Sequence, residues 1–264
     1  MNNAPIGILD SGVGGLSIWK EIVRELPLEA TIYIADSKNA PYGSRTVEEV
    51  CNLADLMVKF LLNKKVKLIV VACNTITVSC LDSLRKDYPE VPIVGIAPVI
   101  KTAAKLSKNK RIGVISTVRT AKSQYLKSLI GKFAQGNKVY VRGTNELVPL
   151  VEQGEFKGER VQGVLRRELS DFQKKDIDSL VLGCSHYPFL RESIEKILGN
   201  GVQVLDSGAA VARQVKRILD NNNALAEKEA RYEFYTTSNR EIMAKIIERV
   251  EARKSLFVVK SVSL

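Results

Sequence analysis

The chain has 264 residues, 45% hydrophobic and 26% charged, a composition that excludes an intrinsically disordered protein. Its 40 Lys and Arg against 29 Asp and Glu give a formal net charge of +11, which can attract nucleic acid, an anionic membrane surface or an acidic metabolite. The basic residues are scattered along the chain, so we expect a basic, solvated surface rather than a dedicated nucleic-acid site.

The N-terminal sequence and the cysteines bear on location and metal binding. No leader-like segment precedes the first apolar run and no stretch is long enough to span a bilayer, so we expect a cytoplasmic protein with no membrane partner. A reducing compartment would keep the four cysteines as thiols. No two cysteines are spaced as C-x2-C and His186 is the single histidine, so we expect no metal site.

Short apolar runs rich in Val and Ile alternate with longer amphipathic stretches. Such runs are typical of strands buried on both faces and joined by helical crossovers, which predicts an α/β protein with mostly parallel sheets flanked by helices. Strands are expected over Pro5–Leu9, Thr31–Ala35, Lys67–Ala72, Ile93–Ile96, Arg111–Ile115, Lys138–Val141, Ser179–Leu182 and Val202–Leu205. Helices are expected over Thr46–Asn63, Gly158–Gln173 and Ser207–Asp220.

The last part of the chain carries weaker patterns. A break at Asn221–Asn223 is followed by a predicted strand over Tyr232–Thr236 and a predicted helix over Asn239–Glu251. Apolar residues within Ser255–Ser263 suggest a final edge strand.

The two halves of the chain are similar in order. Ile6–Asp10 has a counterpart in Ile112–Ser116, and Val70–Asn74 has one in Val181–Ser185. We therefore predict two pseudo-symmetric α/β domains. The first would comprise residues 1–97 plus 207–264 and the second residues 98–206.

Cys73 and Cys184 each stand directly after a predicted strand, at the carboxyl end where parallel sheets place their ligand crevices. A thiol at a helix N-terminus feels the positive end of the dipole, so we expect a lowered pKa and a usable base near neutral pH. Buried cysteines are often structural, but two in matched positions favour catalysis. Cys51 and Cys80 fall within helical patterns and are explained by core packing.

The turn Asp10–Gly15 follows the first strand but lacks the G-x-G-x-x-G spacing of a dinucleotide site. Its glycines would let backbone amides approach an anion such as a carboxylate. Asp10 itself fits either a helix cap or a group that orients or deprotonates Cys73. His186, two residues after Cys184, fits the same assisting role there or a structural one.

Two polar segments after strands are open to two interpretations. Ala40–Gly43 and the stretch from Ser116 to Thr120 are either plain loops or sources of hydroxyl and amide donors for a substrate. Spacing alone favours loops.

Taken together, these segments resemble the glutamate racemases. The similarity runs in family order from residue 7 to about residue 215 and is specific as a combination. The segments that carry it are Gly7–Leu16, Ala40–Gly43, Ala72–Thr75, Val148–Glu152, Gly183–Pro188 and Leu205–Gly208.

The resemblance implies an active site at the interface of the two domains that interconverts L-glutamate and D-glutamate. It implies D-glutamate supply for bacterial peptidoglycan, with no pyridoxal phosphate, metal or other cofactor. Cys184 would take the α-proton from L-glutamate and Cys73 from D-glutamate, assisted by Asp10, Glu152 and His186. The substrate would contact Asp10, Ser11, Pro41, Tyr42, Gly43, Asn74, Thr75, Thr117, Thr120 and Ser185.

The chain departs from the family pattern at three places. Ser185 stands where threonine is usual, Thr144-Asn145 where Cys-Pro is usual, and Ser116-Thr117 where Gly-Thr is usual. Because serine keeps the hydroxyl group, we expect altered substrate affinity rather than loss of activity.

The sequence also bears on other functions. In aspartate racemases the residue after the second Cys-Thr pair is typically Glu, so His186–Pro188 argues against that activity, and the two cysteines argue against a one-cysteine decarboxylase. A basic DNA- or protein-binding module would explain the charge of +11 without catalysis. The resemblance is compatible with a homodimer. Some relatives inhibit DNA gyrase, an interaction that nothing in this sequence supports.

Overall fold

The computed structural model describes residues 2–250 and 257–264. Within these residues the strands form a six-stranded sheet of order β10-β9-β2-β1-β3-β4 and a four-stranded sheet of order β6-β5-β7-β8. Within each sheet the described neighbouring strands pair in parallel, so the predicted α/β fold is confirmed. The first sheet comprises β1 Ile6–Asp10, β2 Thr31–Ala35, β3 Leu68–Val71, β4 Ile93–Gly95, β9 Tyr232–Thr236 and β10 Phe257–Ser261. The second comprises β5 Arg111–Ser116, β6 Lys138–Gly143, β7 Ser179–Gly183 and β8 Gln203–Leu205.

The second sheet repeats the strand order of the first. Strands β2-β1-β3-β4 correspond to β6-β5-β7-β8, and β9 and β10 extend the first sheet beyond β2. In the first sheet the chain runs from β1 to β2 on one side and then to β3 on the other side of β1. In the second sheet it runs in the same way from β5 to β6 and then to β7. The strand order therefore reverses between β1 and β3 and between β5 and β7. Crevices at the carboxyl ends of such strand pairs are where α/β sheets bind ligands.

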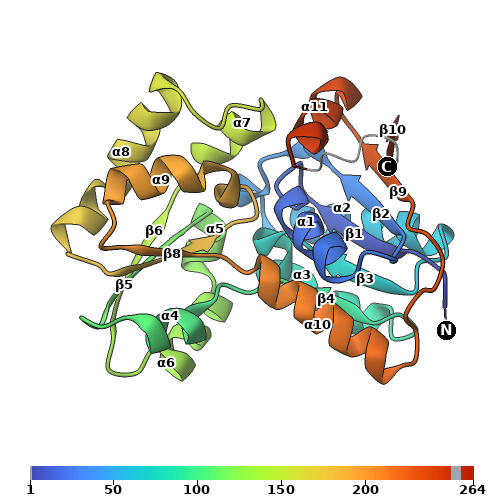
Figure 1. Ribbon diagram of the computed structural model, residues 1–264, viewed down its shortest axis with the longest axis horizontal. Helices are drawn as coiled ribbons and strands as arrows, with labels where there is room; N and C mark the ends of the chain where they lie inside the picture. Colours follow the sequence, from blue (N-terminus) through green and yellow to red (C-terminus); the bar gives the residue numbers. More distant parts are fainter. Residues whose placement is uncertain (1, 251–256) are drawn as a thin grey trace.

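Helices cover both faces of the sheets, and Figure 1 shows the two halves as separate lobes. The core places Ile8 of β1 with Trp19 of α1, and Leu9 with Met57 of α2, because neighbouring strand residues face opposite ways. The helices are α1 Leu16–Glu25, α2 Val47–Asn63, α3 Asn74–Asp87, α4 Ile100–Leu106, α5 Val118–Lys122, α6 Gln124–Phe133, α7 Leu147–Glu152, α8 Glu159–Lys174, α9 Arg191–Leu198, α10 Gly208–Asn221 and α11 Arg240–Val250. Short 3-10 turns are η1 Ser37–Asn39, η2 Tyr42–Ser44 and η3 Tyr187–Leu190.

None of the helices in residues 2–250 and 257–264 is both long and apolar enough to cross a bilayer.

Two connections join the lobes, one before α4 and one before α10. The Ser207 hydroxyl donates a hydrogen bond of 2.6 Å to the carbonyl oxygen of Ala97, so the two connections lie side by side. The residue boundaries predicted for the domains stay a prediction. At the C-terminal end, the strand over Tyr232–Thr236 and the edge position of β10 are as expected, while the predicted positions at residues 251 and 255–256 lie outside the described residues.

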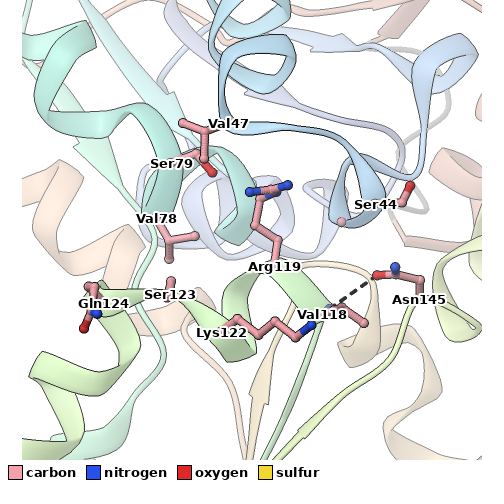
Figure 2. A pocket seen from close by; sticks show the side chains of 11 residues that line it. Ser44, Val47, Val78, Ser79, Val118, Arg119, Lys122, Ser123, Gln124 and Asn145 are labelled. Carbon is pink, nitrogen blue, oxygen red and sulfur yellow. Dashed lines mark hydrogen bonds between the residues drawn. The ribbon is translucent and has the colours of Figure 1, made fainter.

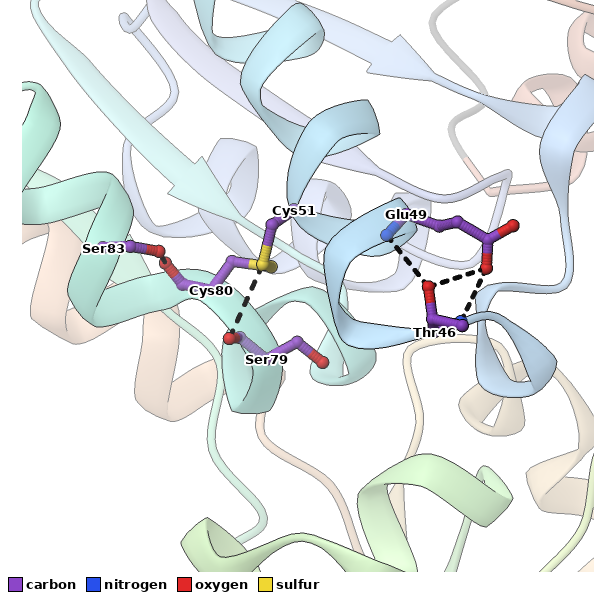
Figure 3. The surroundings of a disulfide bond; sticks show 6 residues. All are labelled: Thr46, Glu49, Cys51, Ser79, Cys80 and Ser83. Atoms are coloured by element: carbon purple, nitrogen blue, oxygen red, sulfur yellow. Dashed lines mark hydrogen bonds between the residues drawn. A yellow bond between two sulfur atoms is a disulfide. The ribbon is translucent and has the colours of Figure 1, made fainter.

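A disulfide bond joins Cys51 of α2 to Cys80 of α3, with Cα atoms 5.4 Å apart (Figure 3). The expectation of four thiols, with core packing alone explaining this pair, is therefore wrong. The two helices pack against each other, and this packing brings cysteines 29 residues apart in the chain into bonding range. Cys73 and Cys184 are free thiols, and both are buried.

Candidate active site

Cys73 follows β3 and is the N-cap residue of α3, with only 4% of its surface exposed. Its Sγ lies 3.4 Å from the Ser11 hydroxyl oxygen, and that hydroxyl donates a 3.0 Å hydrogen bond to Oδ1 of Asp10. Asp10 is the last residue of β1, the strand that pairs with β3. The structure therefore brings together the thiol and the carboxylate that the sequence predicted to assist it.

The pKa of the Cys73 thiol is raised to about 12, so the prediction of a lowered pKa is wrong. Burial is the largest cause, and the negative charge of Asp10 adds to it. The Ser11 hydroxyl and the backbone N–H of Ile76 in the first turn of α3 act in the opposite direction. The helix N-terminus does favour the thiolate, but desolvation outweighs it, and Cys73 rests as a protonated thiol.

Asp10 is fully buried and is not a helix cap. Helix α1 begins at Leu16 with Gly15 as its N-cap and has no side-chain cap, whereas Oδ1 of Asp10 accepts from the Gly12 backbone N–H at 3.2 Å. Its Oδ2 atom is buried and has no hydrogen-bond partner among the described residues. Burial raises the pKa of Asp10, and the charge of His186 lowers it in part. This carboxyl group is therefore closer to accepting a proton at neutral pH than an exposed aspartate.

Cys184 follows β7 as Cys73 follows β3, and it is 5% exposed. Its Sγ lies 3.8 Å from Nδ1 of His186. The other ring nitrogen, Nε2, lies 2.6 Å from Oε1 of Glu152, the last residue of α7. The three residues predicted to act in the second half form one chain of contacts.

His186 is the group whose pKa is shifted most clearly among these three residues. Burial lowers the pKa of His186, but the contacts with Cys184 and Glu152 raise it more, and the pKa ends well above its ordinary value. The imidazole therefore favours its doubly protonated form more than a free histidine does, and in that form it can donate from both nitrogens. The imidazole thus lies directly beside the Cys184 sulfur and links it to Glu152.

The glycine-rich turn after β1 packs against these acid–base groups. A Cβ atom on Gly12 would lie 1.9 Å from Oε1 of Glu152, and one on Gly14 would lie 2.2 Å from Nδ1 of His186. The Val13 backbone N–H donates to Oε1 of Glu152 at 2.7 Å. The turn does bind an anion, as its glycines predicted, but that anion is a carboxylate of the protein itself.

Hydroxyl and amide groups lie near the two thiols at the junction of the lobes. Thr75 and Thr117 join their hydroxyls across the interface at 3.0 Å, and Thr117 donates to Thr120 at 3.0 Å. Both amide atoms of Asn74 are buried and lack a hydrogen-bond partner among the described residues. Ser185 places its hydroxyl 3.5 Å from Nδ1 of His186. These groups are free or adjustable donors for a polar ligand.

The segment Ala40–Gly43 reaches the same interface. Its first peptide bond, Ala40–Pro41, is cis. Tyr42 is buried and donates a 2.6 Å hydrogen bond to Asp36, and a Cβ atom on Gly43 would lie 2.9 Å from that of Thr117. Among the predicted substrate contacts, Gly43 and Thr75 of the first lobe therefore meet Thr117 of the second at the junction.

Sequence reasoning missed other residues at this junction. Asn145 accepts a 3.3 Å hydrogen bond from the Val118 backbone N–H and approaches Gly43, where a Cβ atom would lie 2.3 Å from its Oδ1. Tyr33 donates a 2.7 Å hydrogen bond to the carbonyl of Gly12 and so supports the glycine turn. The signal for Asn145 was its departure from the family pattern; Tyr33 left none.

Comparison with known proteins bears on this geometry. The family model of the Asp/Glu/hydantoin racemases matches residues 6–215. The chain belongs to this family. A glutamate racemase from Clostridium novyi is 43% identical over 221 residues, which are 84% of this chain and 85% of the relative.

Solved structures place the chain within the glutamate racemases of that family. The glutamate racemase of Bacillus anthracis has a TM-score of 0.88 and 35% identity, and the match covers 100% of this chain and 99% of the other. The glutamate racemase of Francisella tularensis, solved in complex with D-glutamate, has a TM-score of 0.86 and 32% identity, and the match covers 100% and 98%. The chain is thus a racemase by family, and its residue roles follow from its own geometry.

Proposed function

We propose that this protein interconverts L-glutamate and D-glutamate by moving the α-proton between Cys184 and Cys73. The observation that carries the proposal is the pair of buried thiols at equivalent strand ends of the two lobes, each with its own ionisable partner. Racemisation needs a base on one face of the α-carbon and an acid on the other. The D-glutamate bound by the Francisella relative supports glutamate as the substrate.

The contacts of the two thiols suit the conversion of L-glutamate. Cys184, next to the protonated His186, takes the α-proton as a thiolate and becomes a thiol. Cys73, whose pKa is raised to about 12, holds a proton and delivers it to the opposite face of the carbanion. The products are D-glutamate, a Cys184 thiol and a Cys73 thiolate.

The reverse reaction needs Cys73 to lose its proton and Cys184 to carry one. His186, whose Nδ1 lies 3.8 Å from the Cys184 sulfur, supplies the proton to Cys184. The Ser11 hydroxyl lies between Cys73 Sγ and Asp10 Oδ1, at 3.4 Å and 3.0 Å. The Cys73 proton passes to the serine oxygen while the serine proton passes to Asp10. The raised pKa of Asp10 makes this carboxylate a suitable acceptor.

The carbanion and its carboxylate carry negative charge that must be stabilised. The unpartnered amide of Asn74 and the hydroxyls of Thr75 and Thr117 are buried polar groups that can donate to this charge. Hydrogen-bond donors act more strongly on a charge where water is excluded than in bulk solvent. These groups would therefore lower the barrier to removing a proton next to a carboxylate.

The family resemblance also supports proposals about the biological role, location and partners of the protein. The product D-glutamate would serve bacterial peptidoglycan synthesis, and the enzyme would act in the cytoplasm without a cofactor. A homodimer is testable by light scattering, and an interaction with DNA gyrase by a supercoiling assay.

Circular dichroism of purified protein with L-glutamate tests the proposal. The signal should decay to zero, and the same signal from L-aspartate should stay constant. Cys73→Ser and Cys184→Ser should each abolish the decay from either enantiomer. Near-normal turnover by either variant would refute the two-thiol scheme, and rapid racemisation of aspartate would favour the aspartate racemase alternative.

A further inference from the structure

A cavity of about 460 Å³ lies at the junction of the lobes (Figure 2). One side is formed by η2, the first turn of α2 and residues Val78 and Ser79 of α3. The other side is formed by α5, the start of α6 and Asn145. Both lobes therefore contribute to its wall, as they do to the candidate active site.

The cavity borders the predicted substrate contacts. Gly43 and Asn145 both line it, and a Cβ atom on Gly43 would lie 2.9 Å from that of Thr117. Thr117 in turn bonds Thr75, two residues after Cys73. The cavity therefore adjoins Gly43, which contacts Thr117, and Thr117 is linked through Thr75 to the segment that carries Cys73.

Two cations line the cavity. Arg119 and Lys122 extend from α5, and none of the residues that line the cavity is acidic. Neither cation forms a salt bridge with a carboxylate in the described part of the chain. Glu49 on α2 feels the charge of Arg119, but it is exposed and is bound by Thr46. The positive charge of the cavity is therefore largely uncompensated.

The two cations differ in their surroundings. The Arg119 guanidinium donates a hydrogen bond to the Arg45 carbonyl oxygen on the opposite lobe, and its Nε is buried without a partner among the described residues. Lys122 is exposed. Arg119 thus spans the junction and its Nε is left without a partner, while Lys122 presents its charge to solvent.

We propose that Arg119 and Lys122 make this cavity a cationic entrance that draws the anionic amino acid toward the thiols. The inference rests on the proposed function, since glutamate carries a net charge of −1 at neutral pH. Unpaired cations beside a low-dielectric wall raise the local concentration of an anion and stabilise it electrostatically. Arg119 and Lys122 are positioning residues: they act on the substrate before it reaches the reacting atoms.

Steady-state kinetics of Lys122→Gln, at low and high ionic strength and from both enantiomers, tests the inference. We expect the KM for glutamate to rise about three- to tenfold with kcat unchanged, and the salt dependence of kcat/KM to flatten. The matched control is Lys127→Gln, because Lys127 is an exposed lysine of α6 that does not line the cavity. The control should behave as the wild type.

Variants of Arg119 give a second test of the inference. Arg119→Gln should raise KM, and Arg119→Lys should restore most of it because the charge is kept. An unchanged KM and an unchanged salt dependence in Lys122→Gln would overturn the inference while leaving racemisation by the wild type intact. A wild type that does not racemise glutamate at all would overturn the proposed function, and the substrate named here with it.

Discussion

His186 and Glu152 lie 2.6 Å apart, between Nε2 and Oε1, although they come from different elements of the second lobe. The same Glu152 oxygen accepts the Val13 N–H of the first lobe. The contact therefore fixes the orientation of the imidazole behind Cys184 and ties it to the turn after β1. The Glu152 carboxylate therefore contacts both His186, the partner of Cys184, and the backbone of Val13 in the other lobe.

Glu152→Gln should weaken proton transfer at Cys184 more than at Cys73. Without its carboxylate partner, His186 has a lower pKa and provides less positive charge beside Cys184. We expect kcat/KM to fall roughly tenfold to a thousandfold. The fall must be equal in both directions, because the enantiomers have equal free energies.

The asymmetry should appear in isotope effects. In Glu152→Gln, the primary deuterium effect of α-deuterated L-glutamate should exceed that of the D-enantiomer, since Cys184 acts on the L-form. The matched control is Glu155→Gln, whose carboxylate pairs with Arg160 outside the site. Equal isotope effects for the two enantiomers would contradict the assignment of Glu152 to Cys184.

Gly14→Ala should lower kcat/KM by about 10²-fold, because the added Cβ would meet the His186 ring at 2.2 Å and displace it. Gly131 in α6 offers a control, since nothing lies within 4 Å of a Cβ there. Gly131→Ala should keep full activity and stabilise the protein by about 0.5–1 kcal/mol, measured by urea unfolding. Full activity in Gly14→Ala would show that the tight packing is not needed.

The raised pKa of Cys73 predicts a distinct pH dependence of alkylation. A pKa of about 12 leaves only about one thiolate in ten thousand at pH 8, and this fraction grows about tenfold per pH unit. Iodoacetamide labelling of Cys73, followed by peptide mass spectrometry in the absence of substrate, should keep rising steeply above pH 9. An ordinary thiol such as glutathione levels off near that pH. A plateau for Cys73 near pH 9 would contradict the raised pKa.

The disulfide predicts the number of free thiols. Unfolded, unreduced protein should react with a thiol reagent at two cysteines, Cys73 and Cys184. Cys51→Ser should keep racemase activity and lower the free energy of unfolding by about 2–4 kcal/mol, because the bond restrains the unfolded chain. Four reactive thiols would show that Cys51 and Cys80 are unpaired in the purified protein.

Much of the fold was predictable because buried parallel strands have a strong local signature. Thr31–Ala35 and Tyr232–Thr236 match the predicted strands residue for residue, and the others differ by one or two residues at their ends. Helix α2 begins one residue after Thr46 because Thr46 and Glu49 form a capping box. The positions of Cys73 and Cys184 after equivalent strands of the two halves could also be predicted from the sequence.

What the sequence could not predict depends on proximity in space. The pKa of Cys73 is set by burial and by Asp10, which is 63 residues away in the chain, and not by its helix position alone. The Cys51–Cys80 bond depends on how α2 packs on α3. The ligand of the glycine turn, Glu152, comes from the other lobe. Each of these properties depends on the contact between two elements that are distant in the sequence, so no single segment could predict it.

Initial-rate racemisation of L-glutamate in D2O tests the central claim, that two thiols act on opposite faces, most directly. Because Cys184 removes the proton and Cys73 delivers a different one, the first D-glutamate formed should carry deuterium at the α-carbon. The L-glutamate recovered at the same time should retain its protium. Early D-glutamate that keeps the original proton, or deuterium that enters the remaining L-glutamate as fast as the product, would contradict a two-base mechanism.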